Sequence, residues 1–324
     1  LYLILNFLGA KVKGYSLKPK KNDNFLFFRK IKKKINSDFG DILDYKKLEK
    51  SLKKFNPEII FHLAAQSLVL ESQRDPEKTF KTNIVGTYNL LEIANNLKNL
   101  RSIIIATSDK CYENKENKNF FDENSKLGGN EPYSQSKALT EHLLIIFKKN
   151  FLKLNICLSS VRAGNVIGGG DFSKYRIIPD IFRSLKHRKV ILRNPLSIRP
   201  WQHVFDVCKG YLLIPPHHYK NKKYYSGPYN IGPLSKKFMN VSNLTKNFIK
   251  FFDDKIIIKK KKSRFVESKY LLLNSNKIKT KLKWKPKYSI YDSLKLSSDW
   301  YLAYLKKKDI SEFSYFQIKK FFNS

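Results

Sequence analysis

The sequence has few of the residues that mark several protein classes. Its three cysteines, Cys111, Cys157 and Cys208, lie far apart and form no CxxC pair. That spacing excludes a zinc ribbon and argues against a disulfide framework, so we expect a reducing, cytoplasmic setting. There is no run of about eighteen apolar residues, which argues against a membrane span. The apolar start also lacks the basic flank and cleavage site of a signal peptide.

Acidic residues are scarce as well, with 27 Asp and Glu against 64 Lys and Arg, for a formal charge of +37. The lysines are spread along the whole chain, which is typical of a solvated surface. We therefore predict no nucleic-acid partner and no membrane partner. The alternative is a non-catalytic basic protein, which salt-sensitive binding to a random DNA duplex would favour. The six histidines have no plausible metal-ligand partners, so we also predict no metal.

Strand-like and helix-like segments alternate through the first half of the chain. Helical patterns occupy 45–55, 75–98 and 131–149, and apolar strand patterns occupy 10–17, 57–65, 101–108 and 154–162, with one more ending at 39–44. Apolar strands that alternate with helices predict an α/β fold, a doubly wound parallel sheet covered on both faces. His62, at the end of one such strand, is interpreted as structural.

The character changes after residue 163. GNVIGGGD (164–171) predicts a loop, and a Pro- and Tyr-rich stretch near 215–228, with His217 and His218, predicts another. We predict a dinucleotide-binding domain over 1–163 and a smaller, partly interleaved substrate-binding part over 164–324.

Polar side chains follow three of the predicted strands, in HLAAQ (62–66), TSDK (107–110) and RAGN (162–165). Ligands of open parallel sheets bind beyond the carboxyl ends of the strands, so these stretches should converge. The next helix carries Tyr133 and Lys137, which the i, i+4 spacing puts on one face. A nearby ammonium group lowers the pKa of a phenol and makes it a usable base.

A resemblance follows from the order of HLAAQ, TNIVGT, TSDKCYEN, YSQSK, VRAGNVIGGGD, IPD and NPLSIRPWQHV. The chain resembles the extended short-chain dehydrogenases/reductases with a Rossmann-like fold, and within them the sugar-nucleotide 4,6-dehydratases. Asp109–Lys110 resembles the CDP-glucose branch, since the dTDP-glucose enzymes carry Asp-Glu there.

The resemblance implies a hydro-lyase that converts CDP-glucose to CDP-4-keto-6-deoxyglucose and water through transient hydride transfer to NAD. Tyr133 would take the C4 hydroxyl proton, with Ser108 bonded to the same hydroxyl and Lys137 on the nicotinamide ribose. Lys110 would remove the C5 proton, and Asp109 would protonate the departing C6 hydroxyl.

The resemblance also implies the binding residues and a homodimer. The cofactor-binding set would be Asp41, Ile42, Leu63, Ala64, Ala65, Tyr133 and Lys137. The substrate-binding set would be Asn165, Arg193, Arg199 and Glu267. The helices at 76–98 and 133–149 resemble the pair that forms the dimer interface in this family.

The chain departs from that pattern at three places. It begins with Leu1 and shows no GxxGxxG turn, so we expect a Rossmann-like sheet lacking its first strand and glycine-rich turn. Lys18 stands where relatives carry an acidic residue for the adenosine ribose, and Leu70–Glu71 where close relatives carry an Arg. A dTDP-glucose 4,6-dehydratase, a 4-epimerase and an inactive truncated homologue therefore remain open alternatives.

Overall fold

The structure is a computed structural model that describes residues 1–19, 35–116, 118–151, 156–234, 238–252, 255–261 and 268–323. Its central sheet has four parallel strands in the order β11-β6-β4-β3. These strands are β3 (Ile59–His62), β4 (Ser102–Ala106), β6 (Cys157–Ala163) and β11 (Tyr229–Ile231). The register pairs Ile104 of β4 with Phe61 of β3 and with Ser159 of β6.

Alternate residues of β4 show that helices cover both faces of the sheet. Ile103 and Ile105 belong to one core cluster, whereas Ile104 belongs to another. The first cluster is completed by α3 (Tyr45–Phe55), α6 (Gly86–Ala94) and α7 (Pro132–Phe151), and the second by α9 (Val204–Lys220) and α12 (Asn276–Leu282). Successive strand residues point to opposite faces, so a strand buried on both faces is apolar throughout.

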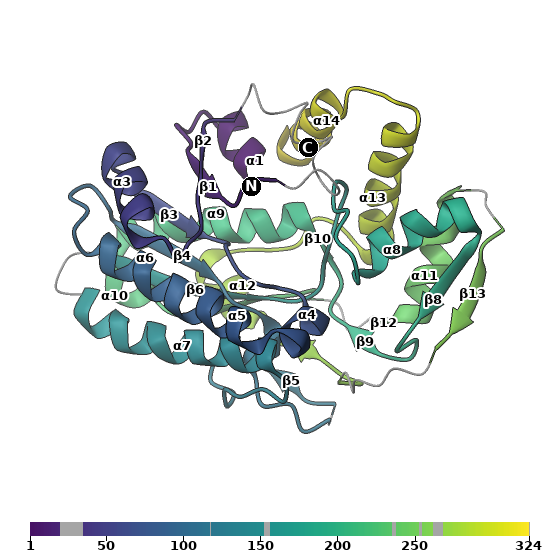
Figure 1. The fold of residues 1–324 in the computed structure, drawn as a ribbon, viewed down its shortest axis with the longest axis horizontal. Helices are drawn as coiled ribbons and strands as arrows, with labels where there is room; N and C mark the ends of the chain where they lie inside the picture. The colour runs from purple at the N-terminus through teal and green to yellow at the C-terminus, as the bar shows by residue number, and fades with distance from the viewer. Residues whose placement is uncertain are drawn as a thin grey trace.

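A second, smaller sheet pairs β1 (Gly14–Ser16) with β2 (Ser37–Phe39) in parallel. In the described part of the chain, no backbone pairing joins these strands to the four-stranded sheet. Helix α1 (Tyr2–Phe7) lies against α14 (Ile310–Asn323), where Phe7 and Phe322 have ring centroids 6.1 Å apart. The two ends of the chain therefore lie side by side (Figure 1).

The second half of the chain builds a smaller part with its own core beside the sheet (Figure 1). Ile181, Leu244 and Tyr301 lie at the centre of this core. The elements of this part are β7 (Val166–Ile167), α8 (Ile177–Ser184), η5 (Leu185–His187), β8 (Lys189–Leu192), β9 (Ile198–Arg199), β10 (Gln202–His203), β12 (Met239–Asn240), α11 (Val241–Ile249), η6 (Lys250–Phe252), β13 (Ile257–Lys260) and α13 (Ile290–Leu305). Because β11, α9 and α12 return to the main sheet, the two halves interleave.

Short elements connect the layers. They are α4 (Val69–Arg74), α5 (Pro76–Phe80), the π-helical turn η2 (Lys81–Val85), the 3-10 turn η3 (Asp109–Cys111), β5 (Phe120–Phe121), α10 (Lys222–Tyr225) and β14 (Leu272–Leu273). The π turn runs directly into α6 and centres on buried Asn83. The Asn83 amide donates to Gln66 O and Ser136 Oγ, at 3.0 and 2.8 Å. The backbone carbonyl of Asn83 accepts from the hydroxyls of Thr87 and Thr140.

Most of the predicted elements are confirmed, and two predictions are wrong. The loop predicted near 215–228 is mostly helix, because α9 extends to Lys220 with Pro215 and Pro216 inside it and α10 follows. Two residues of the glycine-rich stretch, Val166–Ile167, form β7 by pairing with β10. The strand predicted to end within 39–44 does end there, at Phe39. Among the described residues, no helix is long and apolar enough to cross a membrane.

Candidate active site

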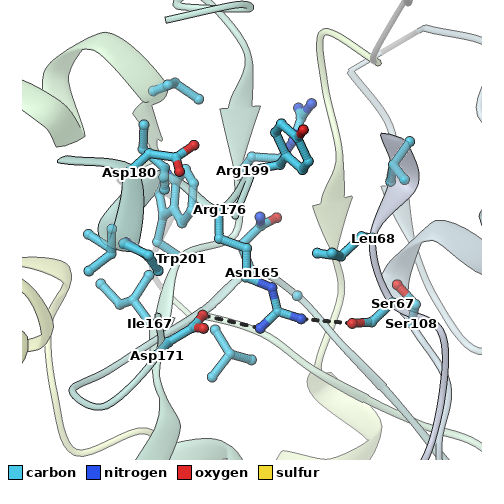
Figure 2. A pocket seen from close by; sticks show the side chains of 18 of the residues that line it. Ser67, Leu68, Ser108, Asn165, Ile167, Asp171, Arg176, Asp180, Arg199 and Trp201 are labelled. Atoms are coloured by element: carbon cyan, nitrogen blue, oxygen red, sulfur yellow. Dashed lines mark hydrogen bonds and ion pairs between the residues drawn. The ribbon is translucent and has the colours of Figure 1, made fainter. Parts of the chain in front are cut away.

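A cavity of about 540 Å³ lies where the carboxyl ends of β4 and β6 face the smaller part of the molecule. The segments 107–110 and 163–165, which follow those strands, line one side. The segments 175–180 and 191–194 also line the cavity. Figure 2 shows Asp180 and Ser108 on opposite sides of the cavity. The convergence predicted for TSDK and RAGN is therefore confirmed.

The turn after β4 presents a buried carboxyl group to this cavity. Ser108 caps the turn, since its hydroxyl accepts from Lys110 N at 3.2 Å and donates to Asp109 Oδ1 at 3.0 Å. The second carboxyl oxygen of Asp109 is buried and has no hydrogen-bond partner within the described structure. Burial raises the pKa of Asp109 to about 6, against the opposing effects of Lys110, the Ser108 hydrogen bond and Arg199. Lys110 also lines the cavity.

Tyr133 reaches the cavity from the first turn of α7, which is tightly capped. The Glu131 carboxylate accepts from Tyr133 N at 2.8 Å and from Ser134 N at 2.9 Å. The Ser72 hydroxyl of α4 lies 3.1 Å from both Tyr133 N and Glu131 Oε2. An acceptor at this position satisfies N–H groups that have no partner inside the helix. The cap therefore fixes where Tyr133 enters the site.

The electrostatics of Tyr133 differ from the prediction. Burial raises the pKa of Tyr133 to about 12, while the Ser108 hydrogen bond and the charge of Arg176 act in the opposite direction. The expected lowering is therefore wrong for this structure, because desolvation of the phenolate outweighs the charges around it.

Lys137 lies one turn further along α7 and is also buried. Its ammonium donates to Ala106 O, the last residue of β4, at 3.1 Å. Burial lowers the pKa of Lys137 to about 8, with Glu141 and Cys111 opposing the shift. Lys137 thus ties the helix to the strand end that precedes the Ser108 turn.

The far wall of the cavity is rich in arginine. Arg199, on β9, and Arg193 line this wall, and Asn165, after β6, lines the cavity as part of the segment 163–165. Arg199 is 4% exposed and Arg193 donates to Tyr175 O at 3.2 Å. These three predicted substrate residues therefore share one cavity with Ser108, Asp109, Lys110 and Tyr133.

Arg176 is a cavity residue that the sequence analysis missed. Figure 2 shows its guanidinium between Ser67, at 2.8 Å, and Asp171, at 3.2 Å. Ser67 follows β3, whereas Asp171 belongs to the smaller part, so Arg176 links the two walls. Tyr175 beside it has a φ of 65°, in the left-handed region that non-glycine residues seldom adopt. The only sequence signal was the position of Arg176 directly before IIPD.

Five residues of the predicted cofactor-binding set, Asp41, Ile42, Leu63, Ala64 and Ala65, do not line this cavity. Asp41 is exposed after β2 and accepts from Leu43 N at 3.0 Å, while Ile42 is buried in the core. Leu63 and Ala64 are exposed and Ala65 is half-buried, directly after β3. Glu267 lies outside the described residues.

Lys18 and Leu70–Glu71, the two other positions at which the chain departs from the family pattern, lie within the described structure. Lys18 is exposed after β1. Leu70 lines the cavity, and Glu71 pairs with Arg74 at 2.9 Å.

Two buried histidines that contact the central strands have structural partners. His62 Nε2 lies 3.0 Å from Thr87 Oγ1, and burial lowers its pKa to about 3, which confirms a structural role. His218 lies between Ser102 Oγ, at 2.7 Å, and Ser159 Oγ, at 2.8 Å, inside α9. Its predicted place in a loop is therefore wrong, because α9 packs it against β4 and β6.

Comparisons with known proteins place these features in a family. The family model described as GDP-mannose 4,6 dehydratase matches residues 12–296. The chain is 36% identical over 318 residues to the CDP-glucose 4,6-dehydratase of Salmonella typhimurium, which covers 96% of this chain and 89% of that protein.

Solved structures share the fold at lower sequence identity. The dTDP-glucose 4,6-dehydratase of Bacillus anthracis in complex with NAD is similar with a TM-score of 0.76 and 21% identity, covering 96% of this chain and 94% of that one. The UDP-glucose 4-epimerase of Thermus thermophilus in complex with NAD has a TM-score of 0.79 and 21% identity, covering 93% and 95%. The chain belongs to the GDP-mannose 4,6-dehydratase family, one of the Rossmann-like epimerase and dehydratase families of the extended short-chain dehydrogenases/reductases.

Proposed function

We propose that the chain is a hydro-lyase that converts CDP-glucose to CDP-4-keto-6-deoxyglucose and water. The observation that carries this proposal is the turn Ser108–Lys110, which places a carboxyl and an ammonium group beside Tyr133 in one cavity. An epimerase needs only the Ser, Tyr and Lys of this constellation, whereas loss of water also requires an acid and a base. The relative that is 36% identical is a CDP-glucose 4,6-dehydratase.

The residues around Tyr133 and Lys137 fit the nicotinamide end of NAD. Lys137 is a buried cation whose ammonium donates to Ala106 O, and its other two N–H groups can serve a ribose hydroxyl. Exposed Leu63 and Ala64 offer an apolar surface at the end of β3 for the dinucleotide. When bound, NAD supplies an acceptor that takes a hydride from the sugar and later returns it. Among the described residues we assign none to the pyrophosphate.

Tyr133 acts as the base at the C4 hydroxyl, with Ser108 bonded to the same oxygen. Because burial holds the pKa of Tyr133 near 12, the reaction needs cations to stabilise its phenolate. Arg176 already acts on Tyr133 in that direction, and we assign the same role to Lys137.

Asp109 and Lys110 carry the elimination. A pKa near 6 leaves a fraction of Asp109 protonated close to neutral pH, which suits a donor to the departing C6 hydroxyl. Lys110 takes the C5 proton, which the 4-keto group acidifies, as its neutral amine and becomes the ammonium. Both groups lie on one short turn, so they approach neighbouring carbons of the same sugar.

Arg193, Arg199 and Asn165 hold the substrate, with the two guanidinium groups on the diphosphate. Planar guanidinium groups suit phosphate oxygens because they donate two parallel hydrogen bonds. Arg176 joins this group as an additional cavity cation. Glu267 stays a prediction from the sequence.

The chain acts as a homodimer in a reducing, cytoplasmic compartment. Val85 and Tyr88 of η2 and α6, and Leu139 and Ile146 of α7, expose apolar side chains by 39% to 61%. Tyr88 contacts Phe147 of α7, so these helices lie side by side. A second copy would cover the exposed stripe. All three cysteines are free and buried, which suits a reducing compartment.

The test is to incubate the protein with NAD and, separately, CDP-, dTDP- and UDP-glucose. We expect a 4-keto-6-deoxy product, detected by its alkaline absorbance, from CDP-glucose at a higher kcat/KM than from the other two. Tyr133→Phe should form none. If only dTDP-glucose gives the product, the substrate is dTDP-glucose and not CDP-glucose. If UDP-glucose is converted to its 4-epimer without loss of water, the protein is an epimerase and not a dehydratase.

A further inference from the structure

A buried ion pair lies next to the Ser108 turn. Glu141 of α7 and Arg162 of β6 are each 2% exposed, and Arg162 Nη2 donates to Glu141 Oε2 at 2.7 Å. Glu141 is one helical turn beyond Lys137 and two beyond Tyr133, on the same face of the helix. Two charges so deeply buried need several hydrogen bonds to offset their desolvation. The residues that supply these hydrogen bonds include one on each side of the Ser108–Cys111 turn.

The carboxylate holds the residue that precedes the turn. The Thr107 hydroxyl donates to Glu141 Oε1 at 2.5 Å, and the Ser160 hydroxyl donates to Oε2 at 2.9 Å. Thr107 N also donates to Val161 O at 3.0 Å. Thr107 is therefore fixed both to α7 and to β6, immediately before Ser108.

The guanidinium holds the residue that follows the turn. Arg162 Nη1 donates to Tyr112 Oη at 2.9 Å, and its guanidinium carbon lies 5.0 Å from the centre of the Tyr112 ring. The Tyr112 hydroxyl donates to Asn230 Oδ1 at 2.6 Å, and its ring stacks on Phe121. Tyr112 is thus fixed on the other side of Asp109–Cys111.

We propose that the Glu141–Arg162 ion pair is a positioning device that clamps both flanks of the Ser108–Cys111 turn and so sets where Ser108, Asp109 and Lys110 meet the substrate. Neither member of the pair reaches the reacting atoms, so both act through Thr107 and Tyr112. The inference rests on the proposed function for its effect on turnover, but the clamp itself is a property of the free protein.

A matched pair of substitutions tests the first flank. Thr107→Val removes the hydroxyl that donates to Glu141 and keeps the shape, whereas Thr107→Ser keeps the hydroxyl. We expect Thr107→Val to lower kcat by about tenfold or more with KM for CDP-glucose within about threefold, since misplacement of reacting groups acts mainly on the transition state. Thr107→Ser should recover most of the loss.

The double variant Glu141→Leu with Arg162→Met tests the whole clamp. Apolar residues of similar size often replace a buried pair without loss of the fold, whereas a single substitution leaves an unpaired buried charge. We expect hydrogen exchange of the backbone amides in 107–113 to rise by about tenfold or more, with kcat lowered as above.

His218→Leu is the control, because His218 joins the same two strands through Ser102 and Ser159, away from the turn. It should lower stability while leaving exchange in 107–113 unchanged and kcat within about twofold.

The proposal is overturned if the double variant changes neither the hydrogen exchange of 107–113 nor kcat. It is also overturned if His218→Leu lowers kcat and raises that exchange as much as the double variant does. If the double variant does not fold, Thr107→Val against Thr107→Ser decides by the same two measurements. If the wild-type protein turns over none of the sugar nucleotides, the proposed function fails, and the exchange measurements still test the clamp.

Discussion

At the residue scale, the depth at which Asp109 is buried controls its chemistry. Asp109 is 5% exposed, and its charged form is disfavoured although Lys110 and Arg199 lie close by. Its folded-state pKa of about 6 exceeds the value of about 3.9 expected in an unfolded chain. The folded protein therefore binds a proton more tightly than the unfolded chain does, and this contribution to stability is lost as pH rises from about 4 through 6.

This sign gives a prediction for Asp109→Asn, which cannot titrate. Relative to wild type, the variant should gain about 3 kcal/mol of unfolding free energy between pH 4 and pH 8, since each pKa unit corresponds to about 1.4 kcal/mol. Urea unfolding at the two pH values measures it. If the difference in unfolding free energy between the two proteins is the same at pH 4 and pH 8, the pKa of Asp109 in the folded protein is the ordinary one.

Lys110→Ala separates the two halves of the proposed reaction. The variant should still oxidise C4, seen as reduced nicotinamide absorbance on the enzyme, but should release product at least about a hundredfold more slowly. A rapid-mixing experiment with CDP-glucose measures both. If nicotinamide reduction disappears as well, Lys110 acts before the elimination, and the role assigned to it is wrong.

The sequence predicted these residues better than their environments. Tyr133 and Lys137 could be placed on one helix face from their spacing alone, and TSDK and RAGN could be placed at strand ends. The pKa of Tyr133 could not be predicted, because desolvation depends on what packs over the phenol. Arg176 was missed for a related reason, since its partners Ser67 and Asp171 are distant in the sequence.

At the scale of single elements, the first turn of α7 is the critical one. Its cap is the Glu131 side chain, and the first N–H groups of the helix belong to Tyr133 and Ser134. Because Tyr133, the proposed base, lies in this first turn, the cap sets the position of that side chain as well as the stability of the helix.

We therefore predict that Glu131→Ala lowers the unfolding free energy by about 1 to 2 kcal/mol and also lowers kcat by about tenfold. Ser289→Ala is the matched control, because Ser289 caps α13 through a capping box with Asp292. Ser289→Ala should lower the unfolding free energy, measured by urea unfolding, by a similar amount and leave kcat unchanged. Equal effects of the two variants on kcat would remove the special role of the α7 cap.

Element prediction failed where tertiary packing overrides local preference. Pro215 and Pro216 predict a break because proline lacks an N–H group and disfavours a helix interior. Yet α9 continues through them, since Tyr211, Ile214 and His218 on its buried face pack beneath the sheet. The pairing of β7 with β10 was equally invisible, because the two dipeptides lie far apart in the chain.

At the scale of the whole molecule, the exposed apolar stripe on η2, α6 and α7 predicts the oligomeric state. The wild-type protein should sediment as a dimer, and Ile146→Glu should shift it to the monomer by placing a charge in the interface. Phe316→Glu is the control, because Phe316 on α14 is exposed to the same degree, 61%, outside the stripe. A monomeric wild-type protein at micromolar concentration would contradict the prediction.

The overall architecture was the most predictable feature. Alternating strand and helix patterns require a parallel sheet covered on both faces, and Ile103, Ile104 and Ile105 show why such a strand is apolar at every position. The return of β11 to the sheet from the second half could not be predicted, since three residues carry too little pattern.

The π-helical turn at Lys81–Val85 limits how this chain can change in length. One residue added to or removed from a helix rotates everything after it by about 100°. A residue added or removed between Asn83 and Leu90 that the π turn does not absorb would therefore rotate Leu90 and Leu91 out of the core relative to Asn83, which Gln66 and Ser136 hold in place. Between Pro76 and Ala94 the fold should therefore tolerate point substitutions better than insertions or deletions.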